Sequence, residues 1–361
     1  MNLSGYLPRY RTSLRLESLD RSIPRRPTLL HTCLAGVFLV SLVLNVLHFT
    51  TAPRTLYSAL DDYQDLNHHS LVNTSSISPL SPADWRGAAI VTTLFSDAYA
   101  PAVLALGHSL RRTNTSARLL LLYLPAQVSQ DALCIATASG FVPHAIARIA
   151  PPAGRGADPH FVDQYTKLRL WTLDALPAPV TRAVYLDSDT LALQPLDALF
   201  ALPFSFGAVP DVWEAHGFTL AFNAGVLVLR PDSALFAQML GKMGEARFPR
   251  KYAEQAFLNQ FFGADAARLP LAYNANLAAK RRAPALWAAL RAHVRVLHYT
   301  VVKPFVAHDW ARVPLERIEE RVREAGEERG GEFREEMEVW GEVWGDARRV
   351  YAERIGECGM D

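Results

Sequence analysis

One uninterrupted stretch without charge, residues 29–49, constrains this chain more than any other feature. Its 21 residues are mostly Leu, Val, Phe, Ala and Gly, and none is Asp, Glu, Lys or Arg. A helix of that length covers the roughly 30 Å hydrocarbon core of a bilayer. A cleaved signal peptide would have a shorter apolar core, and a buried globular helix would show polar residues along one face. The length therefore predicts a transmembrane helix that anchors the chain.

The charges on either side of that stretch predict its orientation. Residues 1–28 form a basic arm with six Arg against two acidic residues, whereas residues 50–87 carry a net charge of −2. Because the more basic flank of a span stays in the cytosol, we expect a single-pass type II signal-anchor with the rest of the chain in the lumen. The N-glycosylation acceptors Asn73-Thr74-Ser75 and Asn114-Thr115-Ser116 lie on the luminal side and predict a glycoprotein.

The overall charge and composition exclude several classes of protein. Lys and Arg number 37 against 36 Asp and Glu, and half of the residues are hydrophobic. A nucleic-acid binder needs a basic excess for its phosphate contacts, so we expect no nucleic-acid partner. The apolar content excludes wholesale disorder. Three cysteines exclude a disulfide framework, and their spacing indicates no zinc site.

After the uncharged stretch the chain divides into three further parts. Residues 50–87 are rich in Ser, Asn, Asp and Pro and predict a solvated stem. Over residues 88–310, short apolar runs alternate with stretches of helical periodicity, which indicates one α/β domain with a largely parallel sheet. Residues 311–361 are rich in Glu and Arg and predict a charged helical tail, either solvated nearly all round or binding a partner. Within the α/β domain we expect strands at 88–94, 118–124, 183–186, 225–229 and 294–298, and helices at 100–112, 129–139, 233–243 and 252–262.

Asp187-Ser188-Asp189 directly follows the apolar run Ala183-Val184-Tyr185-Leu186. In an open parallel sheet, ligands bind just beyond the C-terminal ends of the strands. Two carboxylates at such a place repel one another unless a hard cation neutralises them, and such a cation commonly bridges to substrate phosphates. The alternative is a turn that ends the strand, with Asp187 capping the next segment.

Several blocks of residues 88–305 resemble, in the same order, those of glycosyltransferase family 8, the group that includes glycogenin and the galactinol synthases. The resemblance implies a retaining sugar-nucleotide enzyme with a GT-A-like fold of nucleotide-diphospho-sugar transferases, built on a Rossmann-type, mostly parallel sheet. The matching blocks are residues 91–99, 106–110, 166–171, 185–191, 222–226, 254–259, 269–274, and 298–299 with 303–305.

The resemblance also implies which residues bind the donor, a UDP-sugar. Asp187, Asp189 and His298 would hold Mn²⁺ or another divalent cation, which acts as a Lewis acid on the diphosphate. Taken alone, His298 would fit a histidine at the end of a strand with its hydrogen bonds satisfied. The remaining donor contacts would be made to the diphosphate and the uracil, by Ser188, Lys303, Thr93, Ser96 and Tyr99.

The resemblance implies four further catalytic residues, one at the phosphate and three at the transferred sugar and its acceptor. Lys167 would supply positive charge to the phosphate, and Asn223, Glu254 and Gln255 would face the sugar ring and the acceptor. Taken alone, a lysine is usually an exposed surface residue, and Asn223 would fit a turn. The sequence departs from the family pattern at Lys251, where glycogenin-like members have Asp, at Glu254, which replaces the Asp often found there, and between His298 and Lys303, where Gly is missing.

These observations predict a metal-dependent glycosyltransferase that moves a hexose from a UDP-sugar to an unknown acceptor, which could be a glycan, lipid, protein or polyol; retention of configuration is what the resemblance implies. Because type II transferases usually reside in the Golgi, we expect this location with the catalytic domain in the lumen. In a front-face mechanism the departing diphosphate takes the acceptor proton, whereas in a double displacement Glu254 would be the nucleophile. Two alternatives stay open: a catalytically silent luminal binding protein of the same fold, and a UDP-sugar hydrolase.

Overall fold

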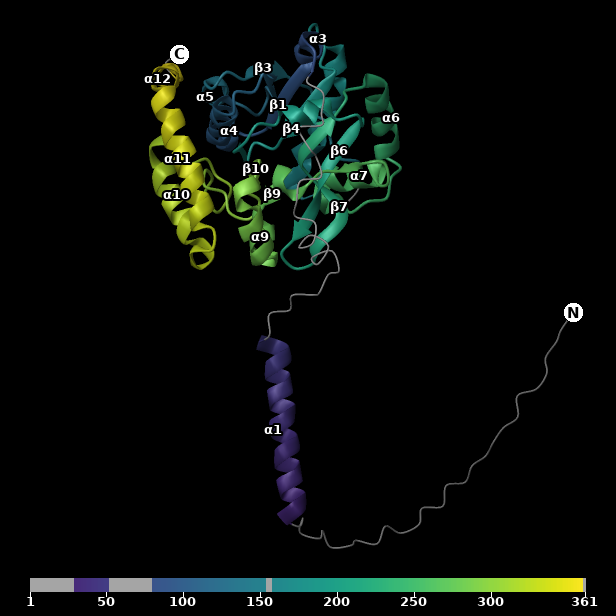
Figure 1. The fold of residues 1–361 in the computed structure, drawn as a ribbon, viewed down its shortest axis with the longest axis vertical. Coiled ribbons are helices and arrows are strands. Elements are labelled where there is room, and N and C mark those ends of the chain that lie inside the picture. Colours follow the sequence, from purple (N-terminus) through teal and green to yellow (C-terminus); the bar gives the residue numbers. More distant parts are fainter. Residues whose placement is uncertain (1–28, 52–79, 154–157, 360–361) are drawn as a thin grey trace, which may run out of the picture. The chain divides into compact units, whose positions relative to one another are not determined.

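The computed structural model describes residues 29–51, 80–153 and 158–359 (Figure 1). The expected basic arm (1–28), most of the expected stem and the Asn73 acceptor lie outside these described residues. The chain forms two compact units, Met1–Arg54 and Thr55–Asp361. The first contains the 23-residue helix α1 (Leu29–Thr51), so the uncharged stretch is helical as expected.

The expected transmembrane span at residues 29–49 is not shown by the structure. Among the residues that the structure describes, no helix is both long and apolar enough to cross a membrane.

The second unit is built on a mixed seven-stranded sheet of order β3-β2-β1-β4-β7-β6-β8. The four strands from β3 to β4 run parallel, whereas β7 is antiparallel to both β4 and β6. The largely parallel sheet that we expected is therefore confirmed with one exception: β7 alone runs against the other six strands, because β6 returns to the direction of β4 and β8 is parallel to β6. The strands are β1 (Ala88–Leu94), β2 (Arg118–Tyr123), β3 (Val142–Ala145), β4 (Arg182–Leu186), β6 (Phe206–Trp213), β7 (Gly217–Leu229) and β8 (Ala267–Arg268).

A second sheet of three short strands lies where the main sheet presents its carboxyl edge. It consists of β5 (Thr190–Ala192), β10 (Val296–His298) and β9 (Ala275–Asn276), in the order β5-β10-β9. The strand expected near residues 294–298 belongs to this sheet and not to the main one. Its pairing opposes His298 to Thr190, which brings a residue late in the sequence beside the Asp-Ser-Asp motif.

Helices cover both faces of the main sheet (Figure 1). Strand side chains alternate between two cores, Ile90 pointing to one and Val91 to the other. The first core includes side chains of α4 (Ala100–Arg112) and α5 (Gln130–Thr137), and the second those of the 3₁₀ helix η3 (Pro159–Ala175), α6 (Ser233–Met243) and α7 (Ala253–Phe262). The four expected α-helices are confirmed within one or two residues at each end.

Shorter helices complete the unit. Helix α3 (Pro82–Arg86) begins at a capping box made by Ser81 and Asp84, inside the segment that we expected to be a stem. Helices α8 (Leu277–Arg282) and α9 (Pro284–Leu290) follow β9.

The charged tail folds as α10 (Ile318–Glu327), α11 (Arg334–Val350) and α12 (Ala352–Glu357). The expectation of a helix solvated nearly all round is wrong, because Trp340 and Trp344 are 1% and 0% exposed within the first core. Together with Met337 and Ala347 they recur every three or four residues, which places them on one helical face. The charged residues between them dominate the composition of the tail, so the composition alone does not reveal this apolar face.

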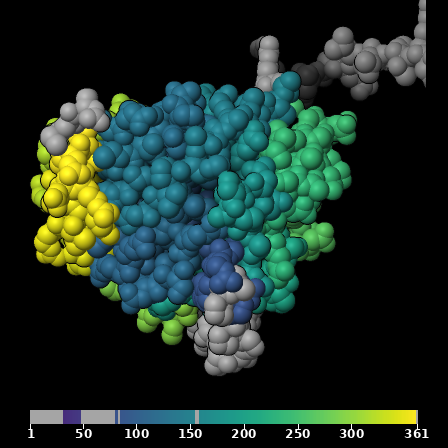
Figure 2. Space-filling model, turned by 90° about the horizontal axis from the view of Figure 1, so that it is seen from above, coloured from purple at the N-terminus to yellow at the C-terminus, as the bar shows by residue number. Residues whose placement is uncertain are grey.

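A disulfide joins the tail to the α/β domain. Cys134 of α5 is bonded to Cys358, 224 residues later, at the end of α12. The three cysteines do exclude a framework of several bridges, but two of them form this single one. Figure 2 shows the yellow C-terminal helices against the blue segments at the start of the domain, in agreement with the packing of α11 on α4 and of α12 on α5.

Candidate metal and diphosphate site

The Asp-Ser-Asp motif forms a tight turn between β4 and β5. Asp187 follows the last residue of β4, and its carbonyl oxygen accepts bonds from the backbone and the side chain of Thr190 at 3.1 and 2.7 Å. The backbone N–H of Asp187 donates to Gly225 in β7 at 2.8 Å. The turn therefore carries two carboxylates at the carboxyl edge of the parallel strands, as the sequence predicts.

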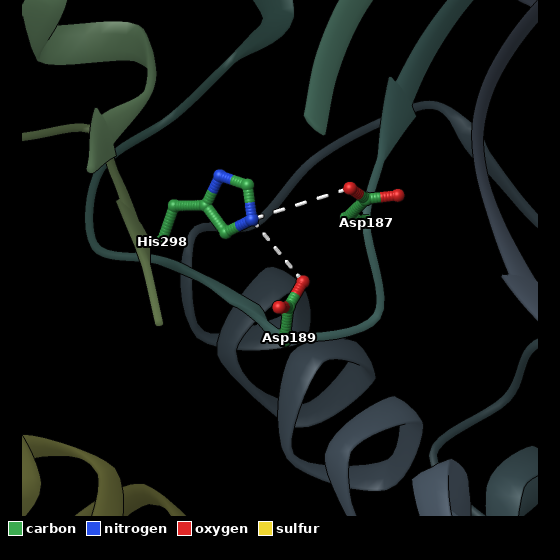
Figure 3. A group of neighbouring side chains, drawn as sticks. All are labelled: Asp187, Asp189 and His298. Carbon is green, nitrogen blue, oxygen red and sulfur yellow. Dashed lines mark ion pairs between the residues drawn. The ribbon is translucent and has the colours of Figure 1, made fainter. Parts of the chain in front are cut away.

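His298 meets these carboxylates from the second sheet (Figure 3). Its Nε2 lies 3.2 Å from Oδ1 of Asp189 and 4.0 Å from Oδ2 of Asp187, and both dashed lines in the figure leave the same ring nitrogen. One ligand atom from each of the three residues lies within 4.8 Å of the others. The structure thus assembles the three expected metal ligands, although His298 lies more than 100 residues after Asp189 in the chain.

A chain of hydrogen bonds fixes which nitrogen of His298 faces the carboxylates. The backbone N–H of Gly225 can only donate, and it donates to Oδ1 of Asn223 at 2.8 Å. That same oxygen accepts from Nδ2 of Asn274 at 2.9 Å, which leaves Oδ1 of Asn274 to accept from Nδ1 of His298 at 2.8 Å. Nδ1 therefore carries a proton and donates it to Asn274, and Nε2 is the nitrogen that faces the two aspartates. Such orienting partners are typical of metal-ligating histidines.

Gly225 is required by the close approach of the imidazole. A Cβ at this position would lie 2.2 Å from Cε1 of His298. A side chain here would push His298 away from the carboxylates.

Two carboxylates and one imidazole nitrogen suit a hard or borderline divalent cation such as Mg²⁺ or Mn²⁺. The orientation of His298 and the proximity of the carboxylate oxygens fit such an ion, whose identity the donor set does not decide. Ser188, between the two aspartates, is buried.

Lys303 brings a positive charge to the same place. Its ammonium group pairs with Oδ2 of Asp189 and donates to the carbonyl of Tyr299 at 3.1 Å. Burial alone would raise the pKa of Asp189, but Lys303 and His298 together lower it well below its ordinary value. Burial opposes the charge of Lys303 as well, and Asp189 nevertheless raises its pKa. Both groups are therefore charged at neutral pH.

Lys167 lies behind Asp187 and is itself buried. Its ammonium group is 2.7 Å from Oδ1 of Asp187 and 2.9 Å from Oε1 of Glu254. Burial would lower the pKa of this lysine, but the two carboxylates raise it well above its usual value. Lys167 thus links the carboxylate of Asp187 to the expected catalytic Glu254, and its ammonium also lies 5.4 Å from the centre of the Tyr185 ring.

The residues expected at the sugar gather on α7 and the β6–β7 hairpin. Glu254 is 3% exposed, and burial raises the pKa of its carboxyl despite the nearby Lys167. Gln255 donates to Oδ2 of Asp211 at 2.9 Å and accepts from the backbone of Ala224, while Asn223 donates to Oδ1 of Asp211. The structure therefore joins Asn223 and Gln255 through Asp211, whereas the shown partner of Glu254 is Lys167.

Asp211 is a site residue that the sequence analysis missed. It is 4% exposed, in β6, and burial raises the pKa of its carboxyl although three donors face it. The signal was present in the sequence: a single acid interrupts the apolar run Phe206–Trp213. An isolated carboxylate in a buried strand is costly unless it is held by hydrogen bonds, so it points to a function or a network.

The three residues expected to frame the uracil occupy different positions. Thr93 makes a 2.9 Å hydrogen bond with the hydroxyl of Tyr185, which donates to Oδ1 of Asp187 at 2.6 Å. Ser96 caps the 3₁₀ helix η2 (Asp97–Tyr99). Tyr99 packs edge-to-face on Phe305, with ring centroids 5.1 Å apart, and burial raises the pKa of its hydroxyl to about 12. Thr93 is therefore tied to the metal site and Tyr99 to the segment that carries Lys303.

An Asp-x-Asp turn at the carboxyl edge of the main sheet, a histidine from the second sheet, the buried Lys167 and the partly buried Lys303 together define a candidate site for a divalent cation and a phosphate group. The chain belongs to glycosyl transferase family 8, whose family model matches residues 90–308. The tail from residue 311 lies outside that match.

Curated relatives carry different activities in their names. Glycogenin of Neurospora crassa is 30% identical over 210 residues, which cover 57% of this chain and 29% of that protein. UDP-glucuronate:xylan alpha-glucuronosyltransferase 2 of Arabidopsis thaliana is 29% identical over 175 residues, covering 48% and 27%. Galactinol synthase 4 of Arabidopsis thaliana is 28% identical over 218 residues, covering 52% and 64%. This chain therefore matches less than two thirds of the length of each.

Proposed function

We propose that the protein is a metal-dependent, retaining glycosyltransferase that moves a hexose from a UDP-sugar to a hydroxyl group of an acceptor. The observation that carries this proposal is the cluster of Asp187, Asp189 and His298 with Lys303 at its edge. Such a cluster matches the needs of a diphosphate leaving group, because negative charge develops there as the sugar departs. One relative is named for the transfer of glucuronate to xylan, and the names glycogenin and galactinol synthase state no acceptor, so the acceptor of this chain stays open.

The chemistry divides between the donor and the residues of the chain. The bond between the anomeric carbon and the β-phosphate oxygen breaks, and its electron pair leaves with UDP. The acceptor oxygen bonds to the anomeric carbon on the same face, and its proton goes to the departing diphosphate. A cation held by Asp187, Asp189 and His298 supplies Lewis-acid stabilisation of the diphosphate. Lys303 adds a positive charge beside it, and the cluster of Asn223, Asp211 and Gln255 offers polar groups to the hydroxyls of the sugar.

A donor panel tests this proposal directly. The protein is incubated with UDP-glucose, UDP-galactose, UDP-glucuronate and UDP-xylose in the presence of Mn²⁺, and free UDP is measured with and without an acceptor mixture. We expect one donor to be consumed, and Asp187→Asn with Asp189→Asn to abolish its consumption. If no donor is consumed or bound and chelation changes nothing, the proposal is wrong. Binding without turnover would favour a silent binding protein, and turnover without acceptor a hydrolase.

We further propose that the domain works in the lumen of the secretory pathway, in the Golgi, with residues 29–49 as its membrane anchor. The disulfide between Cys134 and Cys358 supports an oxidising compartment. The Asn114 acceptor is exposed, as a glycosylated asparagine must be. In cells, we expect the protein to resist carbonate extraction and to lose mass on treatment with peptide N-glycosidase. Asn114→Gln should remove part of that loss; release by carbonate or an unchanged mass would refute the location.

A further inference from the structure

The segment from Tyr299 to Val306 carries Lys303 and is held from behind by the tail. Arg321 of α10 is 7% exposed, and its guanidinium donates to two backbone carbonyls of this segment. Nε donates to the carbonyl of Val306 at 2.7 Å, and Nη2 donates to the carbonyl of Lys303 itself at 3.2 Å. Nη2 also lies 2.6 Å from Oε1 of Glu328, which balances the buried charge.

Two more contacts from the tail hold the same segment. The hydroxyl of Tyr299 donates to the carbonyl of Glu336 at 2.8 Å, and the ring of Phe305 lies 5.9 Å from that of Trp340. Both partners belong to α11. The Lys303 segment is therefore fixed at its beginning, its middle and its end by residues outside the family match.

The tail is itself firmly attached to the domain. The carboxylate of Glu336 pairs with the ammonium of Lys280 at 2.8 Å, and Asp346 lies 2.8 Å from Nε2 of His108 in α4. The Cys134–Cys358 disulfide closes the far end. The carbonyls that accept hydrogen bonds from Arg321 are therefore held by a tail that is itself fixed to the α/β domain.

We propose that Arg321 is a positioning residue for the donor diphosphate: it holds the backbone of Lys303 so that the ammonium group stays directed at the metal site. This inference rests on the proposed function, since it takes the bound group to be the diphosphate of a UDP-sugar. A lysine side chain is flexible, so the position of the Lys303 ammonium depends on where its backbone is held as well as on its partners Asp189 and Tyr299. One planar guanidinium spans two carbonyls, whereas a lysine at position 321 offers a single ammonium and cannot reproduce both bonds in the same geometry.

The proposal predicts a specific pattern of ligand binding. We expect Arg321→Met and Arg321→Lys to weaken the binding of UDP in the presence of Mn²⁺ by about tenfold, the scale of one or two charge-assisted hydrogen bonds. Uridine has no phosphate, so its dissociation constant should stay the same. Lys303→Met should show the same pattern, and Arg321→Met added to Lys303→Met should cause no further loss, because both changes remove one function.

The measurement is isothermal titration calorimetry with UDP and uridine on the full chain, with thermal unfolding recorded for every variant. Arg348→Met is the matched control, because Arg348 is a half-exposed tail arginine whose partner is Glu319 at 3.5 Å; we expect it to bind UDP like the wild type. The proposal is overturned if both Arg321 variants bind UDP as the wild type does, if they lose uridine equally, or if the loss adds to that of Lys303→Met. A wild type that binds no UDP would instead refute the proposed function.

Discussion

Asn274 accepts a hydrogen bond from Nδ1 of His298 at 2.8 Å, and this contact decides which imidazole nitrogen faces Asp187 and Asp189. Without it the ring could rotate or change tautomer, and the metal-binding lone pair would no longer be fixed. Asn274 lies in a block that resembles the family. Neither its being an asparagine nor its distance in the sequence from Asp187 and His298 predicts a role at the metal site.

Asn274→Ala should therefore weaken metal binding without removing a ligand. We expect the affinity for Mn²⁺ to fall about 10- to 100-fold, the range for loss of an orienting partner. Titration of the protein with Mn²⁺, followed by calorimetry or by the paramagnetic signal of the free ion, measures this. Asp189→Asn, which removes a ligand, gives the reference for a larger loss; an unchanged affinity in Asn274→Ala would contradict the role.

Gly225→Ala should damage the site by steric conflict. The new Cβ would lie 2.2 Å from Cε1 of His298, so the ring must move away from the carboxylates. We expect Mn²⁺ affinity to fall and the free energy of unfolding to drop by about 1–3 kcal/mol, as for overpacking in a core. Gly241→Ala in α6 is the matched control, because its Cβ meets nothing within 4 Å. Urea unfolding with chelator present separates the two effects, and equal behaviour of the two variants would refute the steric argument.

Much of the fold could be predicted because its signals are local. The apolar run before Asp187 and the helical periodicity of residues 100–112 depend only on neighbouring residues, and the structure confirms both. The direction of β7 could not be predicted, since a buried strand has the same sequence pattern whether it runs parallel or antiparallel. The three-stranded sheet that contains His298 could not be predicted either, because its strands β5, β9 and β10 pair although they lie far apart in the sequence.

The residues of the site likewise divide into those that the sequence predicts and those that it does not. Asp187, Asp189 and His298 were predicted as a group through the family resemblance, and the structure brings them together. Asp211 and Arg321 were missed because their significance comes from burial. An acid in an apolar strand and one arginine among many in a charged tail acquire their roles only when their partners, far away in the sequence, are in place.

Acid should weaken the fold partly through Asp189. Its pKa lies well below the ordinary value of 3.8, because Lys303 and His298 stabilise the carboxylate against the effect of burial. A depressed pKa contributes stability above 3.8 that is lost as the pH falls further. We expect Asp189→Asn to be less stable than the wild type at pH 7 in the presence of chelator, and the gap to narrow below pH about 4. Urea unfolding between pH 7 and 3 measures it; a gap that widens on acidification would contradict this account.

Loss of the Cys134–Cys358 bond should weaken the attachment of the tail. The bridge closes a loop between residues 224 positions apart, and removing a cross-link of this kind costs about 2–5 kcal/mol. We expect Cys134→Ser to lower the melting temperature, and reducing agent to lower that of the wild type but not that of the variant. Cys33→Ser is the control, because Cys33 is an exposed free thiol, and it should leave the melting temperature and its response to reductant unchanged.

If Arg321 acts through a fixed tail, Cys134→Ser should also weaken UDP binding more than uridine binding. Equal effects on both ligands would show that the bridge stabilises the domain without serving the diphosphate site.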